Sequence, residues 1–179
     1  MKIEIKKFSE LTIVELYALL QLRAEVFVVE QDCVYQDIDG KDQKAMHVLG
    51  YDGDELAAYT RVFKAGDYFD MASIGRVVVS PQHRRKDYGK KIMVASMEFA
   101  FAESKSTKNT IAFSRVQQTI KISAQVYLKK FYNDLGFKGT GKEYLEDGIP
   151  HMEMIVQRWI NFWYKKFLFR FRESENIPN

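Results

Sequence analysis

The sequence of 179 residues has a single cysteine, Cys33, and no apolar run long enough to cross a bilayer. One thiol cannot form an internal disulfide, and without a CxxC pair or clustered His and Cys residues nothing indicates a metal site. A membrane span needs about 18 consecutive apolar residues, and a secretory signal needs an apolar segment after a basic start. Neither pattern is present, so we expect a cytoplasmic protein with no membrane span and no metal.

A strong net charge, internal repeats and low-complexity segments are also lacking. The 27 Lys and Arg residues against 24 Asp and Glu residues give a net charge of +3, which is too mild to indicate a nucleic-acid partner. Hydrophobic residues make up 46% of the chain. That content, at this length, is enough to bury the core of one ordinary domain.

The most informative stretch runs from Ile74 to Met93, IGRVVVSPQHRRKDYGKKIM. Its β-branched start ends at Ser80-Pro81, which indicates a buried strand, and from Tyr88 the apolar residues recur at helical spacing. A loop that enters a helix presents amides without internal acceptors at the positive end of the helix dipole, so it can bind phosphate. Five cations in this loop and the first helical turn favour that role: Arg84, Arg85, Lys86, Lys90 and Lys91.

The stretch RRKDYG, residues 84–89, resembles the Q/R-x-x-G-x-G/A signature with which GNAT N-acyltransferases hold the pyrophosphate of acetyl-coenzyme A. Arg84 and Gly89 match, and Asp87 stands where the signature has a glycine. AQVYLKKFYNDLGF, residues 124–137, is similar to the N-x(6)-Y-x(3)-G-F segment of these enzymes, with Gln125 in the asparagine position. Together with LRAEVFVVEQ near the start and YLEDGIPHMEM in the place of the last strand, these stretches resemble the ElaA-like branch of the superfamily over about residues 1 to 157.

The resemblance implies an α+β (mixed α/β) fold, in which a central, mostly antiparallel mixed sheet splays at the coenzyme A site and is flanked by helices. The GNAT domain would cover residues 1–157, with 158–179 as an extension. The implied activity is acetyl-CoA-dependent N-acetyl transfer to a primary amine of a small molecule or peptide. By the same resemblance, acetyl-CoA would be bound by Val77, Val78, Val79, Arg84, Arg85, Lys86, Asp87, Tyr88, Gly89, Lys90, Gln125 and Tyr132.

Moving an acetyl group from a thioester to an amine requires a neutral amine, a stabilised oxyanion and a proton for the departing thiolate. A sheet that opens beside Val77–Val79 would offer a free backbone amide to the oxyanion. In the resembling family, the tyrosine that corresponds to Tyr132 lies near the sulfur and donates the proton. On spacing alone, Tyr132 fits a core position equally well.

Glu30, His47 and His151 are all candidates for the base. His151 could face the thioester, and Glu30 could hold the ammonium group of the acceptor.

An acidic stretch, EQDCVYQDIDGKD, covers residues 30–42. Its acids are Glu30, Asp32, Asp37, Asp39 and Asp42, against the single cation Lys41. Such a charge run is usually a solvated loop. Alternatively, the carboxylates attract a cationic acceptor, because rigid scaffolds often place specificity on loops, and the resemblance favours this interpretation. Calcium binding is the weakest interpretation, since the twelve-residue spacing with a terminal glutamate is absent.

The remaining patterns predict the other elements. Strands are expected at Lys2–Phe8, Ala45–Tyr51, Glu55–Phe63, Thr119–Ser123, Phe137–Thr140 and His151–Val156. The second and third of these form a hairpin around Asp52-Gly53-Asp54. Helices are expected from a capping box at Thr12 and Glu15 to about Glu30, from Gly89 to about Glu103, and from Ala124 to Leu135, closed by Gly136.

From Gln157 the composition changes to RWINFWYKKFLFRFR, with seven aromatic residues and five cations. We expect this segment to pack on its own domain or to form a homodimer, and binding to a membrane surface is the alternative. This segment and Asp87 also leave open a noncatalytic coenzyme-A-binding or protein-interaction module on the same fold. Nucleic acid is not expected, because no aromatic residues are interleaved with the cations around Arg84.

Overall fold

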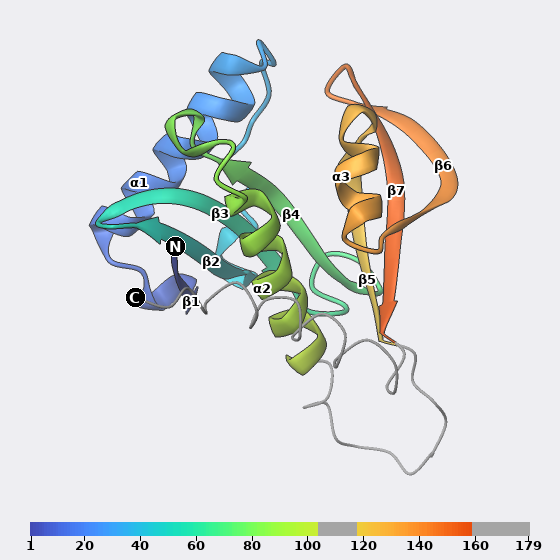
Figure 1. Ribbon diagram of the computed structural model, residues 1–179, viewed down its shortest axis with the longest axis horizontal. Coiled ribbons are helices and arrows are strands. Elements are labelled where there is room, and N and C mark those ends of the chain that lie inside the picture. The colour runs from blue at the N-terminus through green and yellow to red at the C-terminus, as the bar shows by residue number, and fades with distance from the viewer. Residues whose placement is uncertain (104–117, 159–179) are drawn as a thin grey trace, which may run out of the picture.

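The computed structural model of the protein describes residues 1–103 and 118–158, and Figure 1 shows how their elements are arranged. The aromatic segment of the predicted extension, from residue 159 on, lies outside the described residues. Seven strands form one sheet in the order β1-β2-β3-β4-β5-β7-β6. Neighbouring strands are antiparallel except β4 and β5, which are parallel. The predicted mixed, mostly antiparallel sheet is therefore confirmed.

The strands are β1 (Lys2–Lys7), β2 (Met46–Asp52), β3 (Glu55–Phe63), β4 (Ala72–Val79), β5 (Gln118–Gln125), β6 (Lys138–Glu146) and β7 (Ile149–Arg158). The α-helices are α1 (Ile13–Arg23), α2 (Tyr88–Glu103) and α3 (Lys129–Asp134). Helix α1 continues as the π-helix η2 (Ala24–Glu30), and short 3₁₀ turns are η1 (Phe8–Glu10), η3 (Asp42–Lys44), η4 (Pro81–His83) and η5 (Val126–Leu128). Among the described helices, none combines the length and the hydropathy needed to cross a membrane.

The N-terminal helix begins as its sequence predicts. The Thr12 hydroxyl accepts a hydrogen bond from the Glu15 amide at 3.2 Å, and the Glu15 carboxylate accepts one from the Thr12 amide at 2.8 Å. This reciprocal pair satisfies two amides that the helix leaves without partners. With η2 included, the helical segment ends at Glu30, where the apolar pattern fades.

The helix predicted over residues 124–135 begins later than expected. Ala124 pairs with Met152 of β7, so β5 continues to Gln125 before η5 and α3 follow. The burial of Ala124 explains this, because it continues the inward alternation of Ile120 and Ile122 along the strand. The end of α3 is as predicted: Gly136 has a φ of 93°, the conformation that closes a helix with glycine.

The sheet has a hydrophobic cluster on each face. The larger cluster joins α2 and α3 to the strands and contains Val48, Ala58, Ile74, Ile92 and Tyr132. The smaller cluster lies under α1 and contains Leu19, Leu22, Leu49, Tyr59 and Val78. Neighbours such as Val48 and Leu49 point to opposite faces, as strand geometry requires. Strand β4 is therefore held between α1 and α2.

The sheet splits between β4 and β5. These strands pair only where both begin, Ala72 with Ile120 and Ser73 with Lys121, and Figure 1 shows them diverging from that end. A β-bulge bends β4 just beyond this point. On β3 one residue, Thr60, lies between Tyr59 and Arg61. Their partners on β4, Val78 and Gly75, are separated by two residues, so β4 has one residue more than β3 here. One of the two, Arg76, has a φ of 52°, which is rarely populated by a long side chain.

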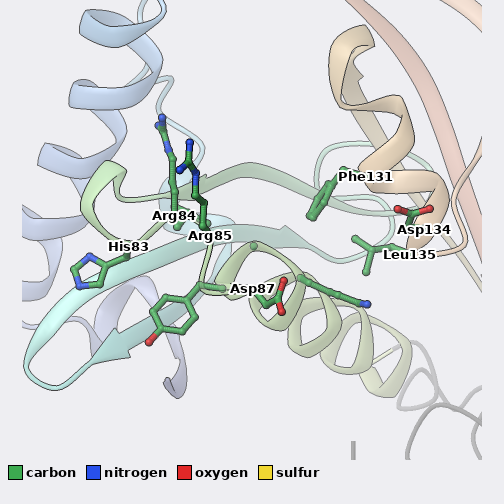
Figure 2. Close-up of a pocket in the computed structure, with 11 residues that line it drawn as sticks. His83, Arg84, Arg85, Asp87, Phe131, Asp134 and Leu135 are labelled. Carbon is green, nitrogen blue, oxygen red and sulfur yellow. The ribbon is translucent and has the colours of Figure 1, made fainter. Parts of the chain in front are cut away.

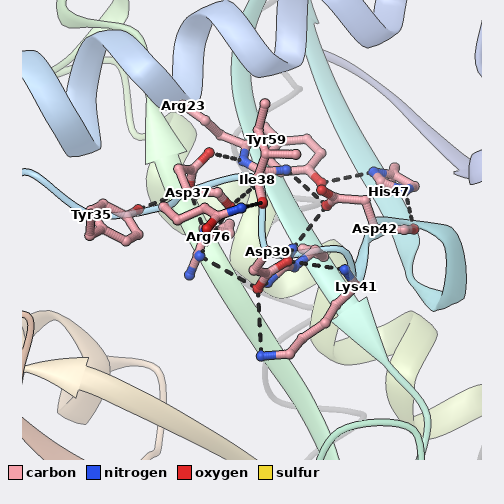
Figure 3. A network of polar contacts seen from close by, with 12 residues as sticks. Arg23, Tyr35, Asp37, Ile38, Asp39, Lys41, Asp42, His47, Tyr59 and Arg76 are labelled. Carbon is pink, nitrogen blue, oxygen red and sulfur yellow. Dashed lines mark hydrogen bonds and ion pairs between the residues drawn. The ribbon is translucent and has the colours of Figure 1, made fainter.

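Three arginines and three aspartates form a buried ion-pair network around this bulge (Figure 3). Arg23, which is 0% exposed, donates to Asp37 and Asp42 at 2.8 Å each. Arg61 donates to Asp39 at 2.7 and 2.8 Å and to Asp42 at 2.9 Å. Arg76 donates to Asp37 at 2.7 Å. The ion pairs hold Arg76 in place, and so support its left-handed backbone.

The network overturns all three interpretations for the 37–42 part of the acidic stretch. Asp37 and Asp42 are buried, so this part is not a solvated loop, and the arginines occupy the carboxylates that were expected to attract an acceptor or bind calcium. Burial alone would raise the pKa of Asp42, but Arg23 and Arg61 outweigh it and hold that pKa below its usual range. The 37–42 part of the stretch therefore serves the interior, whereas Asp32 is exposed and Glu30 forms an exposed ion pair with Arg84.

We expect Arg23→Met to destabilise the protein strongly, because it leaves Asp37 and Asp42 buried with one cation fewer. Breaking a buried ion pair from one side costs about 3–5 kcal/mol. The measurement is urea-induced unfolding followed by circular dichroism. Lys130→Met is the control, because Lys130 forms a solvent-exposed pair with Asp134 and its loss should barely move the midpoint. Equal midpoints for Arg23→Met and the wild-type protein would contradict the structural role of the network.

Candidate active site

A pocket of about 370 Å³, here called the phosphate pocket, lies where the loop after η4 enters α2. Figure 2 shows Arg84 and Arg85 side by side on one wall, with Phe131 and Asp134 of α3 and the following Leu135 across from them. The other lining residues are Val79, His83, Asp87, Tyr88, Gly89 and Lys90.

The backbone of this loop is shaped to bind an anion. Asp87 has a φ of 58°, so it adopts the left-handed conformation for which the signature uses glycine, and aspartate is among the residues that tolerate it best. The first intrahelical bond runs from the Lys91 amide to the Asp87 carbonyl at 3.0 Å. The amides of Tyr88, Gly89 and Lys90 therefore have no acceptor within the helix. Amides in this position point outward at the positive end of the helix dipole.

Gly89 lies where this loop, β4 and α3 come close together. A Cβ atom there would stand 3.5 Å from the Val79 side chain and 3.6 Å from the Phe131 ring, and both of those residues line the pocket. A larger side chain would fill the space beside the free amides. The glycine thus keeps the backbone accessible to a ligand.

The predicted cations do not all face the pocket as free charges. Arg84 pairs with Glu30 at 2.7 Å, and Lys86 pairs with Asp52 at 3.0 Å. Arg85 and Lys90 line the pocket and have no ion pair with any described residue. The attraction for an anion thus comes chiefly from these two side chains and the amides. Tyr88 is largely buried in the core, so its side chain contributes little.

A second cavity, of about 140 Å³, lies between the separated strands and is here called the cleft. Strand β4 contributes Ser73–Val77, β5 contributes Ser123 and Gln125, and β7 contributes Ile149 and His151. The Gln125 amide donates to Gln31 at 3.0 Å, which joins the end of β5 to the end of the N-terminal helical segment.

Helix α3 lies between the two cavities. Phe131 lines the phosphate pocket, and the next residue, Tyr132, lines the cleft. Along β4, Val79 lines the pocket and Val77 lines the cleft, while the side chain of Val78 is buried on the opposite face under α1. The two cavities are therefore linked along β4, which has no strand partner on its β5 side past Ser73.

Tyr132 is 5% exposed, with its ring edge-on to Phe131 and Phe137. Burial raises its pKa well above the usual range, because the phenolate is poorly solvated there. Its hydroxyl has no hydrogen-bond partner among the described residues. A protonated phenol that lines a cleft and has its donor free is suited to protonate a leaving group.

His151 also lines the cleft, and one hydrogen bond fixes its ring. Its Nδ1 lies 2.8 Å from the Ile149 carbonyl oxygen, which can only accept, so Nδ1 carries the hydrogen. In the neutral ring, Nε2 then has a free lone pair. The ring also stacks on Tyr144 with the planes 16° apart.

The other two eligible bases lie elsewhere. His47 is 0% exposed, donates from Nε2 to the Asp42 carbonyl at 3.0 Å and accepts from the Tyr59 hydroxyl at 2.8 Å. Burial also lowers its pKa. His47 is therefore a structural residue, and its prediction as a candidate base was wrong. Glu30 pairs with Arg84 and lines neither cavity.

Sequence reasoning missed the far wall of the cleft. The Tyr144 hydroxyl donates to Ser123 at 2.7 Å, and the Ser123 hydroxyl donates to Glu146 at 2.6 Å. Tyr144 and Glu146 lie on the part of β6 beyond the predicted Thr140 boundary. The exposure of these residues alternates with that of Leu145, as strand geometry requires, but Glu143-Tyr144-Leu145-Glu146 does not alternate in polarity and so carried no signal that the strand continues.

Comparison with known proteins places this arrangement in a family. A family profile described as "Acetyltransferase (GNAT) domain" matches residues 14–158, which is more than half of the chain. The chain therefore belongs to the GNAT acetyltransferase family, and the resemblance seen in its sequence is confirmed. Protein ElaA of Escherichia coli (strain K12) is 42% identical over 148 residues, covering 82% of this chain and 90% of ElaA.

Solved structures agree with this assignment. The crystal structure of Escherichia coli ElaA superposes with a TM-score of 0.75 at 37% identity, covering 87% of this chain and 99% of that one. An acyl-CoA N-acyltransferase from Pseudomonas aeruginosa gives a TM-score of 0.73 at 35% identity, with the same coverage of 87% and 99%. The predicted GNAT fold is thus confirmed.

Proposed function

We propose that the protein is an acetyl-CoA-dependent N-acetyltransferase that transfers the acetyl group directly to a primary amine of a small molecule or peptide. The observation that carries the proposal is the link along β4 between an anion-binding pocket and a cleft that holds a phenol and an imidazole. Acetyl-CoA has matching ends, a diphosphate and a thioester. The similarity to an acyl-CoA N-acyltransferase from Pseudomonas aeruginosa supports the same function.

In this proposal the diphosphate binds to the amides of Tyr88, Gly89 and Lys90, between the side chains of Arg85 and Lys90. Arg84 and Lys86 contribute less, because Glu30 and Asp52 already balance their charges. The pantetheine arm lies along Val77–Val79, where β4 has lost its β5 partner and keeps backbone groups for hydrogen bonds.

The chemistry follows from the groups in the cleft. His151 Nε2 takes a proton from the acceptor ammonium, and the neutral nitrogen forms the new bond to the acetyl carbon. Free amides of β4 stabilise the oxyanion. As the bond to sulfur breaks, Tyr132 gives its proton to the thiolate, and the proton still on the new amide nitrogen returns to the phenolate. His151 is assigned as base in preference to Glu30, because only His151 lines the cleft.

We expect the double variant Arg85→Ala and Lys90→Ala to bind coenzyme A at least about tenfold more weakly, because charge-assisted bonds to phosphate are among the strongest a protein makes. The measurement is isothermal titration calorimetry. A matched control is Lys91→Ala with Lys129→Ala, which removes the same charge from exposed side chains that do not line the pocket. Unchanged affinity in the first variant would place the diphosphate elsewhere.

We expect Tyr132→Phe and His151→Gln each to lower kcat by about 10²-fold, the low end for general acid and base groups, with coenzyme A affinity nearly intact. Release of free coenzyme A, measured with a thiol reagent across a panel of amines, reports the rate. Tyr17→Phe is the control, because Tyr17 is exposed on α1. If the wild-type protein bound coenzyme A but acetylated none of the amines, a noncatalytic binding module would be the better description.

A further inference from the structure

The charge of the cleft comes from two carboxylates at the β6–β7 turn. Arg61 and Arg76 also line the cleft, but together with Arg23 they form ion pairs with the three aspartates of the buried network. Lys41, which pairs with Asp39 at 3.8 Å, does not line the cleft. What remains in the lining is Glu146 and Asp147, a local charge of −2. A ligand of this cleft is therefore favoured if it is positively charged.

Glu146 is held in position by a chain of hydrogen bonds. The Ser123 hydroxyl donates to its Oε2 atom at 2.6 Å, and the Tyr144 hydroxyl donates to Ser123 in turn at 2.7 Å. No cation among the described residues forms an ion pair with Glu146. On the neighbouring strand, Glu153 shows the contrast, because Lys121 pairs with it at 2.6 Å. The Glu146 carboxylate is thus oriented by the Ser123 hydroxyl, which Tyr144 holds in turn, and it is available for a charge-assisted bond to a cationic group of a ligand.

The floor of the cleft independently points to a ligand. Ser73 is 2% exposed and Arg61 is 3% exposed, both line the cleft, and the Ser73 Oγ and Arg61 Nε atoms have no hydrogen-bond partner. Buried polar atoms in native proteins are nearly always paired. Two unpaired atoms in one cavity indicate that a polar ligand completes their hydrogen bonds. Arg61 Nε can only donate, so its partner is an acceptor atom such as the carbonyl oxygen of the proposed acyl donor, whereas Ser73 Oγ can accept from an ammonium group.

We propose that Glu146 binds a second positive charge on the acceptor, so that the preferred acceptor is a diamine or polyamine. The inference rests on the proposed function. A carboxylate that held the reacting nitrogen would stabilise its ammonium form and oppose the proton transfer that the reaction needs. Glu146 is better used on a nitrogen that stays charged while the other one reacts.

The register of the strands sets the spacing of the two nitrogens. Tyr144 lies opposite His151 across the β6–β7 pair, and Glu146 lies two residues further along β6. Such diagonal neighbours are about 7–8 Å apart between their backbones, on the same face of the sheet. An aliphatic chain of four or five carbons between two amines spans a similar distance. The acceptor class is therefore a terminal diamine of about that length, or a polyamine that contains one.

The test compares pentylamine with pentane-1,5-diamine, which differs from it only in the second ammonium group. We expect the wild-type protein to prefer the diamine by at least about tenfold in kcat/KM. Glu146→Gln keeps an oxygen for Ser123 but removes the charge, so it should abolish this preference through KM, with kcat for pentylamine retained. Glu143→Gln is the matched control, because Glu143 is exposed on the same strand and does not line the cleft.

Calorimetric titration of each amine into the protein saturated with coenzyme A gives a second readout. We expect Glu146→Gln to weaken binding of the diamine and to leave binding of pentylamine and of coenzyme A unchanged. A wild-type protein that binds both amines equally, or a Glu146→Gln effect that is the same for both, would overturn the proposal. Acetylation of neither amine, with a diamine-specific effect on binding, would support the role of Glu146 and contradict the proposed function instead.

Discussion

The bulge on β4 depends on the ion pairs between Arg76, Arg61 and Arg23 and the three aspartates of the 37–42 segment. A long side chain at a φ of 52° is unfavourable by itself, and in this fold it is held by a carboxylate that accepts from Arg76 at 2.7 Å. Because the same aspartates also bind arginines on α1 and β3, the bulge is tied to both layers of the N-terminal half.

The two cavities follow from that bulge. Strand β4 bends away from β5 beyond Ser73, which opens the cleft, and it then leads into the loop whose amides line the phosphate pocket. Helix α3 contributes Phe131 to one cavity and Tyr132 to the other. A molecule with an anionic end and a reactive end can therefore contact both through a single extended arm. The interior arginines are paired with aspartates, so the proposed preference for a cationic acceptor rests on Glu146 of β6 and on Asp147 of the following turn.

Much of the fold could be predicted from local patterns, because capping residues, alternation and turn residues act within a few positions. The loop was recognisable from Arg84 and Gly89, and Asp87, which departs from the glycine of the signature, adopts a left-handed backbone in the structure. The network could not be predicted, because Arg76 and Asp37 are 39 residues apart and nothing local links them. For the same reason the acidic stretch was interpreted as a solvated loop or as a loop that attracts a cationic acceptor, and His47 was counted among the candidate bases. The Ser123–Glu146 contact likewise depends on the pairing of β5, β7 and β6, which spacing alone does not give.

The most direct test of this account is a crystal structure of the protein with coenzyme A. The account predicts a pantetheine arm between β4 and β5, with the diphosphate on the amides of Tyr88, Gly89 and Lys90. It also predicts the sulfur within hydrogen-bond reach of the Tyr132 hydroxyl. Coenzyme A bound outside the split between the strands, or a sulfur that points away from Tyr132, would contradict it.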